Sequence, residues 1–156
     1  MGSDSDFGVM RKALEVLEQF DVSYEIAVAS AHRTPDLVAD LVRTASERGV
    51  SVFIAGAGMA AALPGVVAAH TTLPVIGVPL SGSALHGTDA LYAIVQMPPG
   101  IPVATVGIDA ATNAGLLAVQ LLALTDTNLI ERLTAYRLTM ADKVREKSAA
   151  IQEMVN

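Results

Sequence analysis

The stretch Ser30-Ala31-His32-Arg33-Thr34-Pro35 lies between an apolar run at residues 24–28 and an apolar helical pattern that starts near Leu37. Threonine is a common residue at a helix start and proline fits the first helical position, so the chain is predicted to turn from loop into helix here. The run before this turn is rich in β-branched residues, which is typical of a strand. The stretch therefore predicts one strand–loop–helix unit.

The same unit recurs along the chain. Apolar runs at residues 50–55, 74–78 and 102–107 predict further buried strands. Apolar residues at helical spacing predict helices over residues 9–17 and 37–45, the second of which is stopped by Gly49. This alternation predicts a three-layer α/β fold, in which a doubly wound parallel sheet is wrapped on both faces by right-handed crossovers.

Composition narrows the class of protein. A chain of 156 residues is expected to form a single domain. Its 52% apolar content, with only 4% aromatic residues, predicts apolar surface hidden in an oligomer, and a net charge of -6 argues against a nucleic-acid partner. Cysteine is absent and the three histidines are widely spaced, so neither a disulfide nor a metal site is expected. The sequence shows no membrane-length apolar run and no signal pattern, which predicts a cytoplasmic protein without a membrane partner.

Four loops rich in small residues are expected at the carboxyl edge of the sheet, where ligands bind in this architecture. They are residues 2–6, 30–34, 56–59 and 81–87. The first loop is unusual, because a Gly-Ser loop that feeds a helix should follow a strand and only Met1 precedes it. Either the start of the chain is shortened or this edge of the sheet is formed differently, and the sequence does not decide.

The first two loops carry the residues suited to a phosphate. Backbone amides and hydroxyls at Gly2, Ser3 and Ser5 could face an anion, while Asp6 could hold a ribose or simply cap the helix. Arg33 adds a fixed fork of donors, although a surface ion pair is its ordinary alternative.

Histidines supply the candidate proton carriers. Histidine is a common general acid or base, and His32 lies at a strand-to-helix turn, but it could instead be a loop histidine that bonds to the backbone. His70 is expected at a helix end, and His86 lies in a Gly/Ser loop that could face the cleft.

The quartet Ala55-Gly56-Ala57-Gly58 ends a predicted strand with small residues only. Such residues let a ligand approach the backbone closely, and they also permit tight packing of a helix on the strand. The quartet is not a dinucleotide fingerprint, because position 61 is alanine where that pattern requires glycine.

A long amphipathic helix is predicted over residues 126–155. We therefore expect an α/β core at residues 1–124 and a helical arm at residues 125–156. The arm either packs on a neighbouring subunit or is a solvated terminal helix.

Taken together, several segments in order resemble the class I PurE family, the 5-(carboxyamino)imidazole ribonucleotide mutases of purine biosynthesis. These segments are Gly2-Ser3-Asp4-Ser5-Asp6, Ser30-Ala31-His32-Arg33-Thr34-Pro35, Ala55-Gly56-Ala57-Gly58, Leu63-Pro64-Gly65, Leu73-Pro74-Val75-Ile76-Gly77-Val78-Pro79 and Ile94-Val95-Gln96-Met97-Pro98. The resemblance implies a flavodoxin-like domain assembled as a homo-octamer, with no cofactor or metal.

The resemblance also implies roles for particular residues. His32 is the expected general acid/base, and the ribonucleotide is expected to contact Ser3, Asp6, Ser30, Arg33, Ala57 and Gly58. The loop at residues 81–87 would help to enclose the imidazole. One departure is Ala62, which stands where the family usually has a second histidine in Gly-Gly-Ala-Ala-His-Leu-Pro-Gly. His86 is the residue that could compensate.

Two rival functions remain at this stage. A carboxylase would take up free carbon dioxide on the decarboxylated ribonucleotide or a related nucleotide, and bicarbonate-dependent turnover would distinguish it. A non-catalytic nucleotide-binding protein is favoured only by the alanine at position 62.

Overall fold

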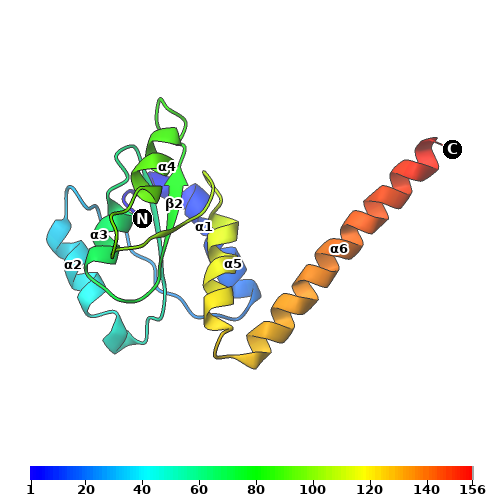
Figure 1. Ribbon diagram of the computed structural model, residues 1–156, viewed down its shortest axis with the longest axis horizontal. Helices are drawn as coiled ribbons and strands as arrows, with labels where there is room; N and C mark the ends of the chain where they lie inside the picture. The colour runs from blue at the N-terminus through cyan, green and yellow to red at the C-terminus, as the bar shows by residue number, and fades with distance from the viewer. Residues whose placement is uncertain (156) are drawn as a thin grey trace.

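Three parallel strands form one sheet in the computed structural model, which describes residues 1–155 (Figure 1). The strand order is β1-β2-β3, with β1 at Phe53–Gly58, β2 at Val75–Leu80 and β3 at Ala104–Thr105. Phe53 pairs with Val75 and the register continues to Gly58 opposite Leu80. The parallel pairing confirms the prediction made from alternating strand and helix patterns.

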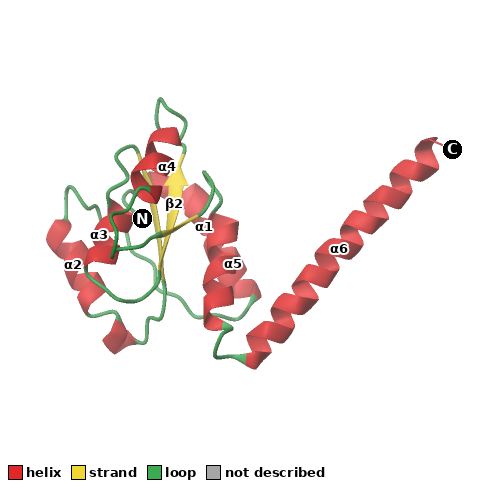
Figure 2. Cartoon of the chain, viewed as in Figure 1, coloured by secondary structure: helices red, strands yellow, loops and turns green. Residues whose placement is uncertain are grey.

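Helices cover both faces of this sheet (Figure 2). One face packs against α1 (Phe7–Gln19) and α5 (Ala111–Leu122), and the other packs against α2 (Pro35–Arg43), α3 (Leu63–Ala69) and α4 (Thr88–Val95). Two short 3₁₀ helices, Asp4–Asp6 and Ser46–Arg48, precede α1 and follow α2. The predicted three-layer, doubly wound α/β architecture is confirmed.

Strand β2 is central and buried on both faces. Ile76 and Val78 face α1 and α5, while Val75 faces α3 and α4 on the opposite side. The layers are packed closely at glycines: a Cβ on Gly115 of α5 would lie 2.9 Å from the Ala13 carbonyl oxygen of α1. This burial holds the carboxyl edge of β2, and the loops that follow it, in a fixed position.

The predicted strand boundaries shift in ways that affect the site. The strand predicted at residues 50–55 begins at Phe53, where the N–H donates to the Pro74 carbonyl, and it continues to Gly58. Residues 56–58, which were predicted to belong to a loop, are therefore the last residues of β1. The run predicted at residues 102–107 keeps only two paired residues, Ala104 and Thr105.

The strand predicted at residues 24–28 is wrong. This segment is drawn as loop (Figure 2), and Ile26 and Val28 are 51% and 50% exposed. A β-strand requires a neighbour that accepts and donates its backbone hydrogen bonds. Among residues 1–155 no chain lies paired along this segment; only Met1 contacts its backbone, through Ala27 and Ala29. The apolar pattern identified residues that favour burial, but no strand of the described chain pairs with them.

The helix α6, at Thr127–Val155, leaves the α/β core (Figure 1). It starts where the Asp126 carboxylate accepts the amides of Asn128 and Leu129. Its first turns pack on α1: Leu129 is buried, and Arg132 donates to the Gln19 carbonyl. Within the described chain no helix combines the length and apolar content needed to cross a bilayer.

Candidate active site

The loop at residues 2–6 is held by a reciprocal cap. The Ser3 N–H donates to Asp6 Oδ2 at 3.0 Å, and the Ser5 N–H donates to Ser3 Oγ at 3.3 Å. This capping box fixes both side chains that were predicted to contact a ribonucleotide. Asp6 Oδ2 is thereby committed to the loop, whereas Oδ1 accepts only a long hydrogen bond of 3.5 Å from the Ser5 hydroxyl and is the oxygen more available to a ligand hydroxyl.

The turn at residues 30–34 has its own closed network. Thr34 is the N-cap residue and Pro35 the first residue of α2, as predicted, yet the Thr34 hydroxyl does not cap the helix. It accepts the Ser30 N–H at 2.9 Å and donates to the Ser30 carbonyl at 3.2 Å. Since Ser30 Oγ also accepts the Arg33 N–H at 3.2 Å, Ser30 and Thr34 together set the direction of the residues between them.

Arg33 joins the two loops. Its guanidinium donates to the Gly2 carbonyl at 3.1 Å and to Ser30 Oγ at 3.4 Å. Within residues 1–155 no carboxylate lies in ion-pair range of Arg33, so the surface ion pair considered from sequence is not formed there. The guanidinium therefore lies beside the first turn of two helices with its charge uncompensated, which is the arrangement that attracts an anion.

His32 lies in the same turn and is exposed. Its ring makes no hydrogen bond to another described residue, so the alternative of a backbone-bonded loop histidine finds no support. Both ring nitrogens are free to exchange protons with a bound molecule. The turn positions the ring through Ser30 and Thr34 on either side of it.

The end of β1 brings the first loop to the sheet. The Gly2 N–H donates to the Gly56 carbonyl at 3.3 Å, so the start of the chain lies beside β1. Ala57 is buried in the core shared by α2 and α3, and only its backbone is available to a ligand. A Cβ on Gly58 would lie 3.3 Å from the Leu80 carbonyl oxygen, so glycine allows the ends of β1 and β2 to lie close together.

The loop at residues 81–87 is clamped by residues that the sequence reasoning did not single out. The Asp109 carboxylate accepts the Ser81 N–H at 3.0 Å and also the Ser81 hydroxyl. Asp89 accepts the Ser83 hydroxyl at 2.9 Å. Gly87 has a φ of +83°, and a Cβ there would lie 3.1 Å from the Ser81 Cα, so glycine closes the loop.

Two further positions bear on the departure from the family pattern. Ala62 is half-buried at the start of α3 and contributes no side-chain cap. His86 is exposed with a positive φ of 51°, and its N–H donates to the Ser83 carbonyl.

His70 ends α3 as predicted, which places it at the opposite edge of the sheet from His32. Among the described residues no three His, Asp or Glu side chains lie together as a metal site would require.

The geometry and the fold define a class: an α/β enzyme with a small-molecule site built from loops at the carboxyl edge of its sheet. The chain belongs to the AIR carboxylase family, which matches residues 1–143. A Pyrococcus abyssi protein named N5-carboxyaminoimidazole ribonucleotide mutase is 59% identical over 140 residues, which are 90% of this chain and 80% of the relative.

A second relative carries a different name. The phosphoribosylaminoimidazole carboxylase of Schizosaccharomyces pombe is 50% identical over 99% of this chain, which covers 28% of that longer protein. Among solved structures, Treponema denticola PurE superposes with a TM-score of 0.83 and 30% identity, covering 94% of this chain and 91% of that one. The fold is therefore flavodoxin-like, as the resemblance implied.

Proposed function

We propose that this chain is a 5-(carboxyamino)imidazole ribonucleotide mutase, which moves a carboxylate from the exocyclic nitrogen of the substrate to a carbon of its imidazole ring. Family membership and the names of relatives at 50–59% identity support this reaction. One observation supports placing this reaction at the candidate site. Arg33 has no acidic partner in the described chain, and its guanidinium joins the Gly2 and Ser30 loops.

Binding would use the two loops that Arg33 joins. The ribonucleotide phosphate lies against the Arg33 guanidinium and the hydroxyls of Ser3 and Ser30, at the start of α1 and α2. Asp6 Oδ1, whose only other hydrogen bond is the long one from the Ser5 hydroxyl, accepts a ribose hydroxyl. The imidazole lies over the backbone of Ala57 and Gly58, and the clamped loop at residues 81–87 closes over it. No metal or cofactor takes part in this scheme.

His32 would carry the proton in both halves of the reaction. Protonated His32 donates to the exocyclic nitrogen as its bond to the carboxylate carbon breaks, which releases carbon dioxide into the closed cleft. The ring carbon then bonds to the carbon dioxide, and neutral His32 removes the proton from that carbon. The imidazole ends in its starting state, and general acid/base catalysis of this kind contributes about 10²- to 10⁴-fold.

Substitutions at the two loops test this assignment. His32→Asn keeps a polar group without proton exchange, so we expect kcat to fall at least about 100-fold while KM changes little. Arg33→Ala removes a charged donor worth about 1.5–3 kcal/mol, so we expect KM to rise roughly 10- to 150-fold. The matched control is His70→Asn, at the opposite edge of the sheet, which should leave both constants unchanged. A near-normal kcat for His32→Asn would remove His32 from the mechanism.

The carboxylase is the second candidate, because a relative 50% identical over 99% of this chain carries that name. It would use the same site with free carbon dioxide, and only its source of the carboxylate would differ. Dependence of turnover on added bicarbonate separates the two reactions.

The assembly is proposed to be a cytoplasmic homo-octamer in which α6 packs on a neighbouring subunit. An apolar stripe along one side of α6 supports this arrangement. At its start, Leu133 and Tyr136 pack on the core of their own chain. Met140, Val144 and Ile151 continue the stripe at intervals of four and seven residues and are exposed. An apolar stripe that is covered at one end and bare beyond it fits contact with a second subunit.

A further inference from the structure

His86 is an exposed histidine with a strained backbone at the carboxyl edge of the sheet. Its φ of +51° lies in the left-handed region, which residues with a side chain rarely adopt. Strain of this kind persists only where surrounding contacts impose it, and it is concentrated at ligand sites. The backbone of His86 therefore directs attention to what its side chain binds.

Hydrogen bonds on both sides of His86 hold this conformation. The His86 N–H donates to the Ser83 carbonyl at 3.0 Å, and the Thr88 N–H donates to the Leu85 carbonyl at 3.1 Å. Ser83 is itself fixed, because its hydroxyl donates to Asp89 at 2.9 Å. The backbone of His86 is thus held in place while its side chain is exposed to solvent.

The end of β2 places His86 close to the proposed position of the substrate ring. A Cβ on Gly87 would lie 3.3 Å from the Leu80 carbonyl oxygen, and a Cβ on Gly58 would lie 3.3 Å from the same oxygen. Gly58 and Gly87 therefore both lie against the last residue of β2. His86 directly precedes Gly87, and Gly58 is one of the two residues over which the substrate ring is proposed to lie.

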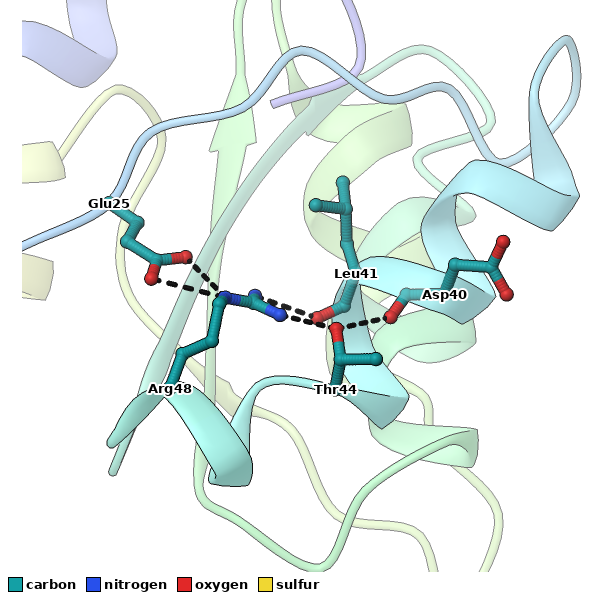
Figure 3. Close-up of polar contacts among 5 residues, drawn as sticks. All are labelled: Glu25, Asp40, Leu41, Thr44 and Arg48. Carbon is teal, nitrogen blue, oxygen red and sulfur yellow. Dashed lines mark hydrogen bonds and ion pairs between the residues drawn. The ribbon is translucent and has the colours of Figure 1, made fainter.

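The His86 ring makes no hydrogen bond or ion pair with another residue in the part of the chain that the structure describes. Other basic side chains do find acidic partners: Arg48 Nε donates to both carboxylate oxygens of Glu25, at 3.0 and 3.1 Å (Figure 3). Asp89 lies only three residues after His86, yet it accepts the Ser83 hydroxyl instead. Both nitrogens of the His86 ring therefore remain available to a bound molecule.

The charges of the proposed substrate call for a further donor. The ribonucleotide carries two anionic groups, a phosphate and a carboxylate. The four loops rich in small residues at this edge contain three basic side chains, those of His32, Arg33 and His86. Arg33 is assigned to the phosphate and His32 to proton transfer. Because Asp6 in the same set of loops disfavours an uncompensated anion, His86 is the group suited to the carboxylate.

We propose that His86 binds the carboxylate of the ribonucleotide, through a hydrogen bond from a ring N–H to a carboxylate oxygen. This role rests on the proposed function, because it places the substrate ring over the end of β1. The hydrogen bond forms with the carboxylated substrate and with the carboxylated product. The decarboxylated ribonucleotide lacks the group that His86 recognises, so His86 determines how strongly the site prefers carboxylated nucleotides.

Two dissociation constants test this role in the full-length chain. Calorimetry measures the binding of 4-carboxy-5-aminoimidazole ribonucleotide and of 5-aminoimidazole ribonucleotide, which differ only in the carboxylate. His86→Gly removes the ring, and glycine adopts a positive φ without strain, so the variant should fold. We expect Kd for the carboxylated nucleotide to rise roughly 10- to 150-fold, as for a lost hydrogen bond to a charged group. Kd for the decarboxylated nucleotide should change less than about threefold.

Met59→Gly is the matched control. Met59 lies at the same edge of the sheet, is 64% exposed and has a positive φ of 56°. Its replacement by glycine relieves the same kind of strain and frees the backbone in the same way, but it removes no hydrogen-bond donor. The ratio of the two dissociation constants should therefore stay at the native value.

Other outcomes overturn the role of His86. An equal change of both dissociation constants in His86→Gly would show that the residue acts on the loop and not on the carboxylate. An equal loss of preference in Met59→Gly would attribute the effect to backbone freedom. If the native chain binds neither nucleotide, the proposed function fails as well. If it binds both and His86→Gly keeps the native ratio, only the role of His86 is refuted.

Discussion

Replacing Asp109 with alanine tests whether this residue, which is distant in the sequence, holds the loop at residues 81–87 in place. Asp109 lies beyond β3, has a φ of +55°, and donates its N–H to the Pro79 carbonyl at 2.9 Å. Its carboxylate accepts both the N–H and the hydroxyl of Ser81. One residue therefore ties the end of β2, the site loop and the end of β3 together.

Asp109→Ala should lower the free energy of unfolding for two separate reasons. Asp109→Ala leaves the partly buried Ser81 N–H without its acceptor, which costs about 1–3 kcal/mol. Alanine also tolerates a left-handed backbone less well than aspartate, which adds about 1 kcal/mol. We expect a total loss of about 2–4 kcal/mol in the free energy of unfolding. Asp109→Asn retains one acceptor and tolerates the same φ, so it should lose only about 1 kcal/mol.

Urea unfolding followed by far-ultraviolet circular dichroism measures these differences. Asp109→Gly separates the two losses, because glycine removes the carboxylate without the penalty for positive φ. We expect the order of stability to be native, Asn, Gly and Ala, and we expect KM for the ribonucleotide to rise in the same order. An alanine variant within about 0.5 kcal/mol of the native chain would show that Asp109 does not hold the loop.

Three further predictions concern packing, charge and assembly. Gly115→Ala should destabilise the chain by about 1–3 kcal/mol in thermal unfolding, since its Cβ meets α1, whereas Gly8→Ala meets nothing within 4 Å and should stabilise it by about 0.5–1 kcal/mol. Burial lowers the pKa of the Met1 amine below 8.0 in the folded chain, an effect that nearby Asp6 partly offsets. As pH falls, the amine is therefore protonated at a higher pH in the unfolded chain than in the folded chain. The free energy of unfolding should therefore rise as pH increases towards 8.0 and then level off, and the acetylated chain should lack this rise. Val144→Glu should yield smaller species by light scattering, whereas Leu138→Glu, on the opposite side of α6, should not; equal behaviour of the two would contradict the proposed stripe.

The fold was predictable where the chain provides its own partners. Apolar runs at β1 and β2 indicated parallel strands because each is buried between two helical layers. The same pattern at residues 24–28 gave a wrong prediction, since strand formation depends on a neighbour that the described chain does not provide. Pattern alone reports which residues favour burial, and it does not report whether a partner is present.

The candidate site was predictable only in part. Convergence of the loops followed from the parallel sheet, and the Gly2 contacts with Arg33 and Gly56 agree with it. The Asp109 clamp was missed because it joins positions 28 residues apart, and no local pattern signals such a pair. An acidic residue in a turn just beyond a strand was the available hint. The Thr34 hydroxyl bonds to Ser30 instead of capping α2, a choice that depends on loop geometry.

Transfer of an isotopically labelled carboxylate tests the proposed mutase reaction most directly. The substrate is 5-(carboxyamino)imidazole ribonucleotide labelled in its carboxylate, and the reaction is run without added bicarbonate. If the cleft around His32 confines the released carbon dioxide, product forms and the label stays with it. Full exchange of the label with dissolved carbon dioxide before product forms would contradict confined transfer, and the carboxylase would then replace the mutase as the function of this chain.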